Sequence, residues 1–178
     1  MIDRTRVTTR QRGGFTLIEA IATIVVLGAL GSIASSILFT VSESYLKASA
    51  IAQMHNEASS AMERMVRELR NIPSTPTGVS IDATQTSSLT WSGTSGFSLN
   101  GSQLRFSHAG GHYALANNCA AFQVQAFDHS GNALPATMNA AQAQHVRRIV
   151  LTITLEQNGL SHTVRSGVYI RSAIALDA

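Results

Sequence analysis

The chain has 178 residues, of which 44% are hydrophobic and 13% are charged. These proportions exclude a disordered polyampholyte and fit one domain of ordinary size, or one domain with a long appendage. The formal net charge of +3 lies in the first fourteen residues, which contain Asp3 together with Arg4, Arg6, Arg10 and Arg12. The remainder is formally neutral, so we expect no basic surface for nucleic acid.

Residues 20–42 carry no formal charge and are rich in Ile, Val, Leu and Ala. A helix needs about 20 such residues to cross a bilayer. The large apolar side chains of this stretch contribute about −3 to −7 kcal/mol to insertion, whereas Glu19 at its edge costs at most about 3 kcal/mol. We therefore predict one membrane span, and the arginines before it predict a cytoplasmic N-terminus with an exported body.

Glu19 stands at the head of the apolar stretch, where a carboxylate is costly and usually has a partner. One hypothesis is a helix-start acid that interacts with the helix dipole and reaches the membrane interface. The other hypothesis is a protease cleavage site before Glu19, at Gly13 and Gly14, whose flexible backbone a protease can hold extended. Cleavage after Gly14 would create a new amine on Phe15 and make Glu19 the fifth residue of the product.

Residues 14–19, Gly-Phe-Thr-Leu-Ile-Glu, follow a short basic leader and precede an apolar helix, and this run resembles the type IV prepilin family. The resemblance implies that a prepilin peptidase cleaves between Gly14 and Phe15 and N-methylates Phe15. It also implies that Glu19 pairs with the Phe15 amine of a neighbouring subunit. An α-amine, with a pKa of about 7.7–8.0, is largely cationic at neutral pH, and either charge is costly if left unpaired in apolar surroundings.

A second export signal competes with this interpretation. Ser32-Ile33-Ala34 is a small-x-small triplet after a basic and an apolar region, and an ordinary signal peptidase would release a soluble protein that starts at Ser35. Against this alternative, Glu19 interrupts the head of the apolar region, and apolar residues continue to position 41.

Gly28 and Gly31 lie inside the predicted span, where each costs a helix roughly 1 kcal/mol relative to alanine. Glycine is common in membrane helices, so the two residues have an ordinary explanation. Alternatively, they make the helix flexible and, with the serines four positions later, form small faces for close helix packing.

The helix is predicted to continue through residues 43–72 as an amphipathic segment. Apolar residues recur at spacings of three and four, which gives one stripe: Ile51, Met54, Ala58, Ala61, Met65 and Leu69. We expect this stripe to contact the chain's own sheet, with a seam for a partner helix as the alternative. Two oppositely charged pairs, Glu63/Arg67 and Arg64/Glu68, are predicted on the solvent side. Pro73 and Pro76 end the helix.

Residues 73–178 are predicted to form an antiparallel β-sheet domain. Residues 74–103 contain loops and brief strands, and Asn100-Gly101 is a two-residue hairpin signal inside 97–106. Alternating patterns at 122–126 and 149–155 predict strands, and Asn158-Gly159 predicts a turn into a last strand through residues 164–170. The fold class is therefore α+β, a long N-terminal helix laid on an antiparallel sheet.

Four later runs resemble minor pilins and pseudopilins of the J and W types, and minor proteins of mannose-sensitive haemagglutinin pili: 61–70, 115–118, 128–132 and 146–149. The chain departs from major pilins in its large body and in lacking a C-terminal cysteine pair, and Glu19 argues against the tip pseudopilin that lacks this acid. The resemblance implies four segments, namely a leader (1–14), a transmembrane assembly helix (15–42), its continuation (43–72) and an exported body (73–178).

The resemblance implies a structural function. The chain would be a minor pilin or pseudopilin that initiates or supports assembly of a type IV pilus or a type II secretion pseudopilus. The implied partners are other minor and major pilins or pseudopilins, the prepilin peptidase and methylase, an inner-membrane platform protein and the membrane. The subunit would lie in the bacterial inner membrane and then in the fibre. A major fibre pilin and a competence-type DNA-uptake pilin remain alternatives.

No residue pattern predicts catalysis, a metal or a cofactor. His108 and His112 are four apart, but glycines between them prevent a shared helical face. Residues 128–132 lack the spacing of a calcium loop, and a hairpin turn explains them more simply. The single cysteine, Cys119, excludes an intramolecular disulfide and a Cys-rich zinc site, and we expect it to be a small buried hydrophobe.

Overall fold

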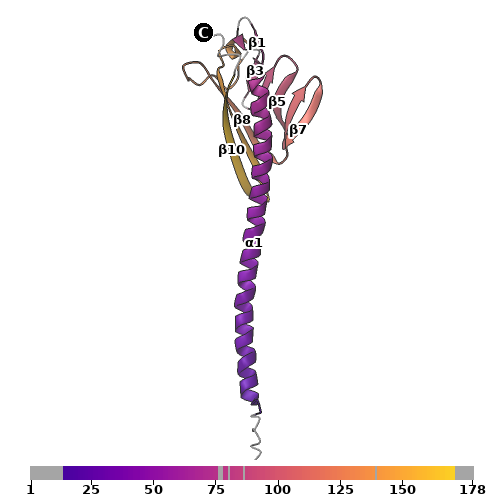
Figure 1. Cartoon of the computed structure of the whole chain (residues 1–178), viewed down its shortest axis with the longest axis vertical. Coiled ribbons are helices and arrows are strands. Elements are labelled where there is room, and N and C mark those ends of the chain that lie inside the picture. The colour runs from indigo at the N-terminus through magenta and orange to yellow at the C-terminus, as the bar shows by residue number, and fades with distance from the viewer. Residues whose placement is uncertain (1–13, 76–77, 80, 86, 139, 171–178) are drawn as a thin grey trace, which may run out of the picture. The chain divides into compact units, whose positions relative to one another are not determined.

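The computed structural model describes residues 14–75, 78–79, 81–85, 87–138 and 140–170 (Figure 1). The chain groups into two units, Met1–Leu46 and Lys47–Ala178. The predicted leader, apart from Gly14, and Pro76 lie outside the described residues.

Helix α1 (Leu17–Arg70) is continuous over 54 residues. At its end, the Asn71 amide donates to the Glu68 carbonyl and the Ile72 amide donates to the Leu69 carbonyl. Such i→i−3 bonds tighten a last helical turn, and Pro73 follows directly. The predicted helix and its end before Pro73 are therefore confirmed.

The buried stripe of α1 lies in the unit Lys47–Ala178. It consists of Met54, Ala58, Ala61, Met62, Met65 and Leu69. The expectation of a core contact is therefore confirmed, because these side chains pack in the chain's own core. The prediction is wrong for Ile51, which remains 41% exposed, and it missed Met62, which is 5% exposed. Periodicity identifies the buried face of a helix, but it does not reveal how far along the helix the sheet extends.

The described residues after α1 form ten strands in three antiparallel sheets. Their bounds are β1 (Ser74–Thr75), β2 (Gly78–Val79), β3 (Ile81–Gln85), β4 (Ser88–Trp91), β5 (Ser95–Asn100), β6 (Gln103–His108), β7 (Gly111–Ala116), β8 (Cys119–Phe127), β9 (Arg148–Gln157) and β10 (Leu160–Tyr169). Strands β1 and β2 pair with each other, β3 to β7 follow one another across a five-stranded sheet, and the third sheet has the order β10-β9-β8. A short helix, α2 (Ala140–Ala143), precedes β9. The α+β fold is as predicted.

The two predicted hairpins differ in how well their loops were located. Asn158 and Gly159, with φ of 53° and 74°, form the two-residue loop between β9 and β10, as predicted. In the earlier hairpin, Asn100 pairs with Gln103, so the loop is Gly101-Ser102 and the predicted register is wrong by one residue. With this register, Gly101 is the only one of the two loop residues with a positive φ, of 59°, and Asn100 remains in the strand.

Side chains from α1 and from both larger sheets form one hydrophobic core, and Figure 1 shows the later part of α1 running along these sheets. Alternate residues of β8 point into this core, with Phe122 and Val124 buried and Gln123 exposed. Within the five-stranded sheet, the Trp91 and Phe97 rings lie 5.0 Å apart between centroids. This arrangement follows from the period-2 pattern of the strands and the stripe of the helix.

Arg64 corrects the predicted charge pairs. Its guanidinium carbon lies 5.5 Å from the Phe106 ring centroid and 5.8 Å from that of Tyr113, so the side chain lies on the sheet and not on the solvent side. In the described part of the chain, neither Arg64 nor Arg67 forms an ion pair with the glutamate four residues away. A partly desolvated contact with aromatic rings is worth more than an exposed ion pair on a helix.

Candidate functional site

The start of α1 has the geometry of a capped helix. Gly14, Phe15 and Thr16 precede the helix and are exposed, Phe15 by 67%. The Glu19 amide donates to the Thr16 side-chain oxygen at 3.3 Å and to its carbonyl at 3.1 Å. Thr16 is therefore the residue that caps the helix, and it satisfies an amide that has no partner within the helix. The bond between Gly14 and Phe15 lies outside regular secondary structure.

Glu19 lies in the first turn of α1 with an exposed side chain. It occupies the position at which a glutamate can return a hydrogen bond to the capping residue, but within the described residues its carboxylate has no hydrogen-bond or ion-pair partner. The helix dipole favours an acid here by about 0.3–1 kcal/mol, so the helix-start hypothesis is compatible with this placement. The same placement leaves the carboxylate available to a cation from another molecule.

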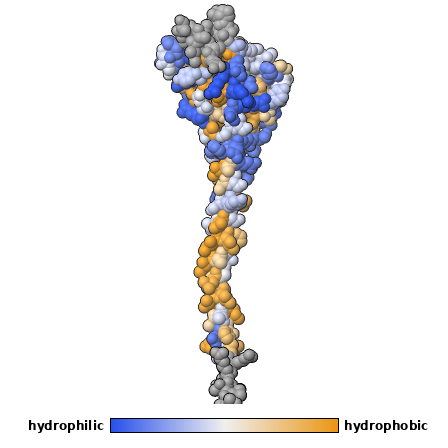
Figure 2. All heavy atoms as spheres, in the orientation of Figure 1, coloured by the Kyte–Doolittle hydropathy of each residue, from blue (hydrophilic) through white to orange (hydrophobic). Residues whose placement is uncertain are grey.

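The described part of the first unit, residues 14–46, exposes its large apolar side chains. From Leu17 to Leu46 the large hydrophobic residues are 55–81% exposed, and Figure 2 shows them as a nearly continuous apolar surface. By length and composition, α1 is able to cross a membrane, and a signal sequence near the N-terminus would meet the same criterion.

Hydroxyl groups in the apolar stretch donate to carbonyl oxygens one turn earlier in the helix. The Thr23 hydroxyl lies 2.6 Å from the Glu19 carbonyl oxygen, and the Thr40 hydroxyl lies 3.0 Å from that of Ser36. Ser32 and Ser36 form equivalent bonds to Ala29 and Ile33. Because these polar groups are already paired inside the helix, their transfer to an apolar environment costs less than that of free hydroxyls.

The two competing cleavage positions differ in conformation. Gly14–Phe15 precedes the helix, whereas Ala34–Ser35 lies inside the continuous helix. Gly28 and Gly31 are also helical, and a Cβ built on either would meet no atom within 4 Å. Packing inside this chain therefore does not require glycine at these two positions.

His108, His112 and the turn at 128–132 form local hydrogen bonds. His108 and His112 belong to the β6–β7 hairpin, where their Nδ1 atoms lie 2.9 Å and 2.8 Å from the hydroxyls of Ser95 and Ser107. Asp128 accepts hydrogen bonds from the Asn132 backbone and side-chain amides at 2.8 Å and 3.0 Å. The predicted turn at 128–132 is therefore confirmed.

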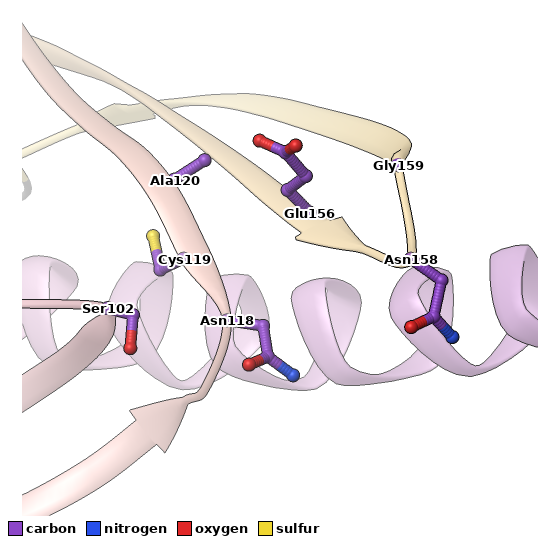
Figure 3. A pocket seen from close by; sticks show the side chains of 7 residues that line it. All are labelled: Ser102, Asn118, Cys119, Ala120, Glu156, Asn158 and Gly159. Carbon is purple, nitrogen blue, oxygen red and sulfur yellow. The ribbon is translucent and has the colours of Figure 1, made fainter.

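Cys119 is 2% exposed, as predicted, and burial raises the pKa of its thiol. It borders a surface pocket of about 320 Å³ that is also lined by Ser102, Asn118, Ala120, Glu156, Asn158 and Gly159. In Figure 3, Asn118 and Asn158 point to one side of the strands and Glu156 to the other. The polar groups do not converge, and a thiol with a raised pKa is a poor nucleophile, so this pocket lacks the arrangement of a reaction centre.

Two polar contacts were not predicted because they join residues distant in sequence. Glu57 on α1 accepts a hydrogen bond of 2.6 Å from the Asn117 amide in the β7–β8 connection. His55 on α1 and His162 on β10 approach with their ring nitrogens 3.1 Å apart. No sequence spacing marks either pair, because 60 and 107 residues separate their members.

No protein-family model matches the sequence, and no curated protein matches it. The motif at 14–19 and the geometry around it are therefore the basis for the functional proposal.

Proposed function

We propose that this chain is a prepilin-like subunit that is cleaved between Gly14 and Phe15 and then assembles through its apolar helix. The observation that carries the proposal is the Glu19 carboxylate, exposed and unpartnered within the described residues at the head of an exposed apolar helix. A new Phe15 amine on a neighbouring subunit would supply the opposite charge, and neither charge would then remain unpaired in apolar surroundings.

The conformation around Gly14 supports cleavage at this position. Proteases bind their substrates as extended chain, and Gly14 and Phe15 are exposed and precede the first helical residue, Leu17. Ala34 and Ser35 lie within the helix, where cleavage would first require local unwinding. The product would begin at Phe15, two residues before a capped helix.

The packing of the second unit supports a role in assembly. Its stripe on α1 is buried in the unit's own core, whereas the large apolar side chains of residues 17–46 are exposed in the described structure. In the proposal, this exposed segment spans the inner membrane before assembly, with the N-terminus cytoplasmic, and packs among pilin helices afterwards. We propose a minor pilin or pseudopilin of a type IV pilus or type II secretion machine, whose partners are related subunits, the prepilin peptidase and a platform protein.

The first test is the mass of the N-terminal peptide of the full chain, extracted from membranes of cells that express a prepilin peptidase. We expect a methylated Phe15 start, and we expect Gly14→Val to remain uncleaved because the side chain obstructs the peptidase. Gly31→Ala is the matched control, because its Cβ meets no neighbour in the chain. A Ser35 start, or an uncleaved wild-type chain beside an active peptidase, would refute the proposal.

The second test separates processing from assembly. We expect Glu19→Gln to be cleaved and methylated normally but to lose incorporation into sheared fibres or into complexes with the related subunits. Glu63→Gln, an exposed acid on the same helix, is the control and should assemble normally. Normal assembly of Glu19→Gln would restrict Glu19 to its role at the helix start. The abundance of the wild-type chain in sheared fibres distinguishes a minor from a major subunit.

A further inference from the structure

His55 and His162 form a pair between the helix and the sheet within the unit Lys47–Ala178. The Nδ1 atom of His55 and the Nε2 atom of His162 lie 3.1 Å apart. The ring centroids are 5.2 Å apart and the ring planes meet at 75°. Helix α1 carries the first histidine and the long strand β10 carries the second, so regular secondary structure holds both backbones. This pair is independent of the proposed cleavage and assembly.

The separation of the two nitrogens matches that of two ligands on one transition-metal ion. With metal–nitrogen bonds of 2.0–2.1 Å, two imidazole nitrogens lie about 2.9 Å apart at a right angle and about 3.4 Å apart at the tetrahedral angle. The observed 3.1 Å falls between these values. Once the proton between them has left, rotation of the rings would direct the lone pairs of both inner nitrogens toward one ion.

The inner nitrogens of the pair are His55 Nδ1 and His162 Nε2, and the outer nitrogens are His55 Nε2 and His162 Nδ1. The outer nitrogens can carry the ring protons when a metal binds the inner ones. Among the described residues, the ring nitrogens of the two histidines form a hydrogen bond only with each other, so the nitrogen of each ring that faces away from the pair has no protein partner there. In the hydrogen-bonded pair, one inner nitrogen carries a proton. When a metal binds, this proton moves to the outer nitrogen of the same ring, both inner nitrogens become ligands, and two neutral imidazoles suffice without net proton release.

We propose that His55 and His162 bind a divalent transition metal that clips α1 to β10. Imidazole ligands suit Zn²⁺, Cu²⁺ and Ni²⁺, whereas Mg²⁺ prefers oxygen. The described residues contain no group of three or more metal-ligating side chains, so water completes the coordination and the ion exchanges readily. Sequence spacing cannot predict such a site, because its ligands are 107 residues apart.

The test uses the full chain in detergent, purified without a histidine tag and stripped with a chelator. Thermal unfolding is followed by the fluorescence of Trp91, the single tryptophan, which is 5% exposed. The measurements are made with and without Zn²⁺ or Ni²⁺ at a pH above the imidazole pKa of about 6.5. A ligand of the folded state raises the unfolding temperature, so we expect a metal-dependent increase that EDTA reverses, one ion per chain by calorimetric titration, and no increase with Mg²⁺.

The variants His55→Asn and His162→Gln separate metal binding from the hydrogen bond. Their amide nitrogens stand near the positions of Nδ1 and Nε2, so each variant can keep a polar contact while it loses a metal ligand. We expect each to weaken metal affinity by about tenfold or more, whereas His145→Ala, an exposed histidine outside the pair, retains it. An absent increase in the wild type, an increase unchanged in both pair variants, or an equal loss in His145→Ala would overturn the proposal.

Discussion

At the scale of single residues, short polar contacts organise the loops of the sheet domain. The Asp128 carboxylate accepts two hydrogen bonds from Asn132, and Gly131, with φ of 82°, turns the chain between them. The Glu57 carboxylate on α1 accepts a hydrogen bond from the backbone amide of Asn117. These contacts use a carboxylate as an acceptor for backbone amides that would otherwise rely on water.

Asp128 makes stability depend on pH in the acid range. The side-chain hydrogen bond from Asn132 is the largest cause that lowers the pKa of Asp128 from its ordinary value of 3.8. A lowered pKa in the folded state means that the stabilisation is complete above the ordinary value and is lost as the pH falls through the folded-state value. We expect Asp128→Asn to have a lower urea midpoint than the wild type near neutral pH, with the difference vanishing in strong acid. A difference independent of pH would contradict this assignment.

Glu57 should stabilise the packing of α1 against the β7–β8 connection. We expect Glu57→Ala to lower the free energy of unfolding by about 1 kcal/mol, because the Asn117 amide loses a charged acceptor in a partly solvated site. Urea unfolding followed by Trp91 fluorescence measures the change. Glu63→Ala, an exposed acid without such a contact, is the control, and an equal loss in both variants would show that the hydrogen bond contributes nothing.

At the scale of elements, α1 is one helix with two different environments. Its first part exposes apolar side chains all around, and its last part buries a single stripe. The strand pattern is regular in β8, where alternation reports directly which residues face the core, whereas in β9 the consecutive residues Ile149, Val150 and Leu151 are all buried. The loop at Gly101 shows the limit of local signals, since a dipeptide predicts a turn but the pairing of both strands decides its register.

Leu69 and Ile51 test where the core begins along α1. Leu69 is 0% exposed and Ile51 is 41% exposed, although both fit the same apolar stripe. We expect Leu69→Ala to cost about 2–5 kcal/mol, because it leaves a cavity in a packed core, and Ile51→Ala to cost less than about 1 kcal/mol. Chemical denaturation of the full chain in detergent gives both values. Comparable losses would mean that Ile51 is covered in solution.

At the scale of the whole molecule, the chain separates into a unit that exposes apolar surface and a unit that contains the core. Among the residues that the structure describes, every buried hydrophobic residue lies at position 54 or later. The boundary between the units falls at Leu46 and Lys47, inside the continuous helix. The second unit therefore has the elements of an independent fold, whereas residues 14–46, the described part of the first unit, contain no buried residue.

This division predicts that residues 47–178 fold without the first unit. We expect the truncated chain to be soluble without detergent and to unfold in one cooperative transition with Trp91 buried, because no core residue is removed. The full chain should need detergent, since its large apolar side chains between 17 and 46 are exposed. Size-exclusion chromatography and Trp91 fluorescence test both statements. An aggregated truncated chain with exposed Trp91 would show that the first unit contributes to folding.

The sequence by itself determined the features that depend on neighbours within a few residues. These are the helix and its end at Pro73, the buried and exposed faces of β8, the Asn158-Gly159 turn and the motif at 14–19, whereas in β9 Val150 is buried although the alternating pattern places it opposite Ile149 and Leu151. Each of them has a short period or a short motif, so a local pattern suffices to predict it.

The tertiary structure decided which distant residues meet. In this structure Ile51 lies outside the core and Arg64 contacts the Phe106 ring. His55 and His162 form a hydrogen bond although 107 residues separate them. Such pairs depend on how far the sheets extend along the helix and on the register of every intervening strand. These quantities are set by packing of the whole core, and no local pattern contains them.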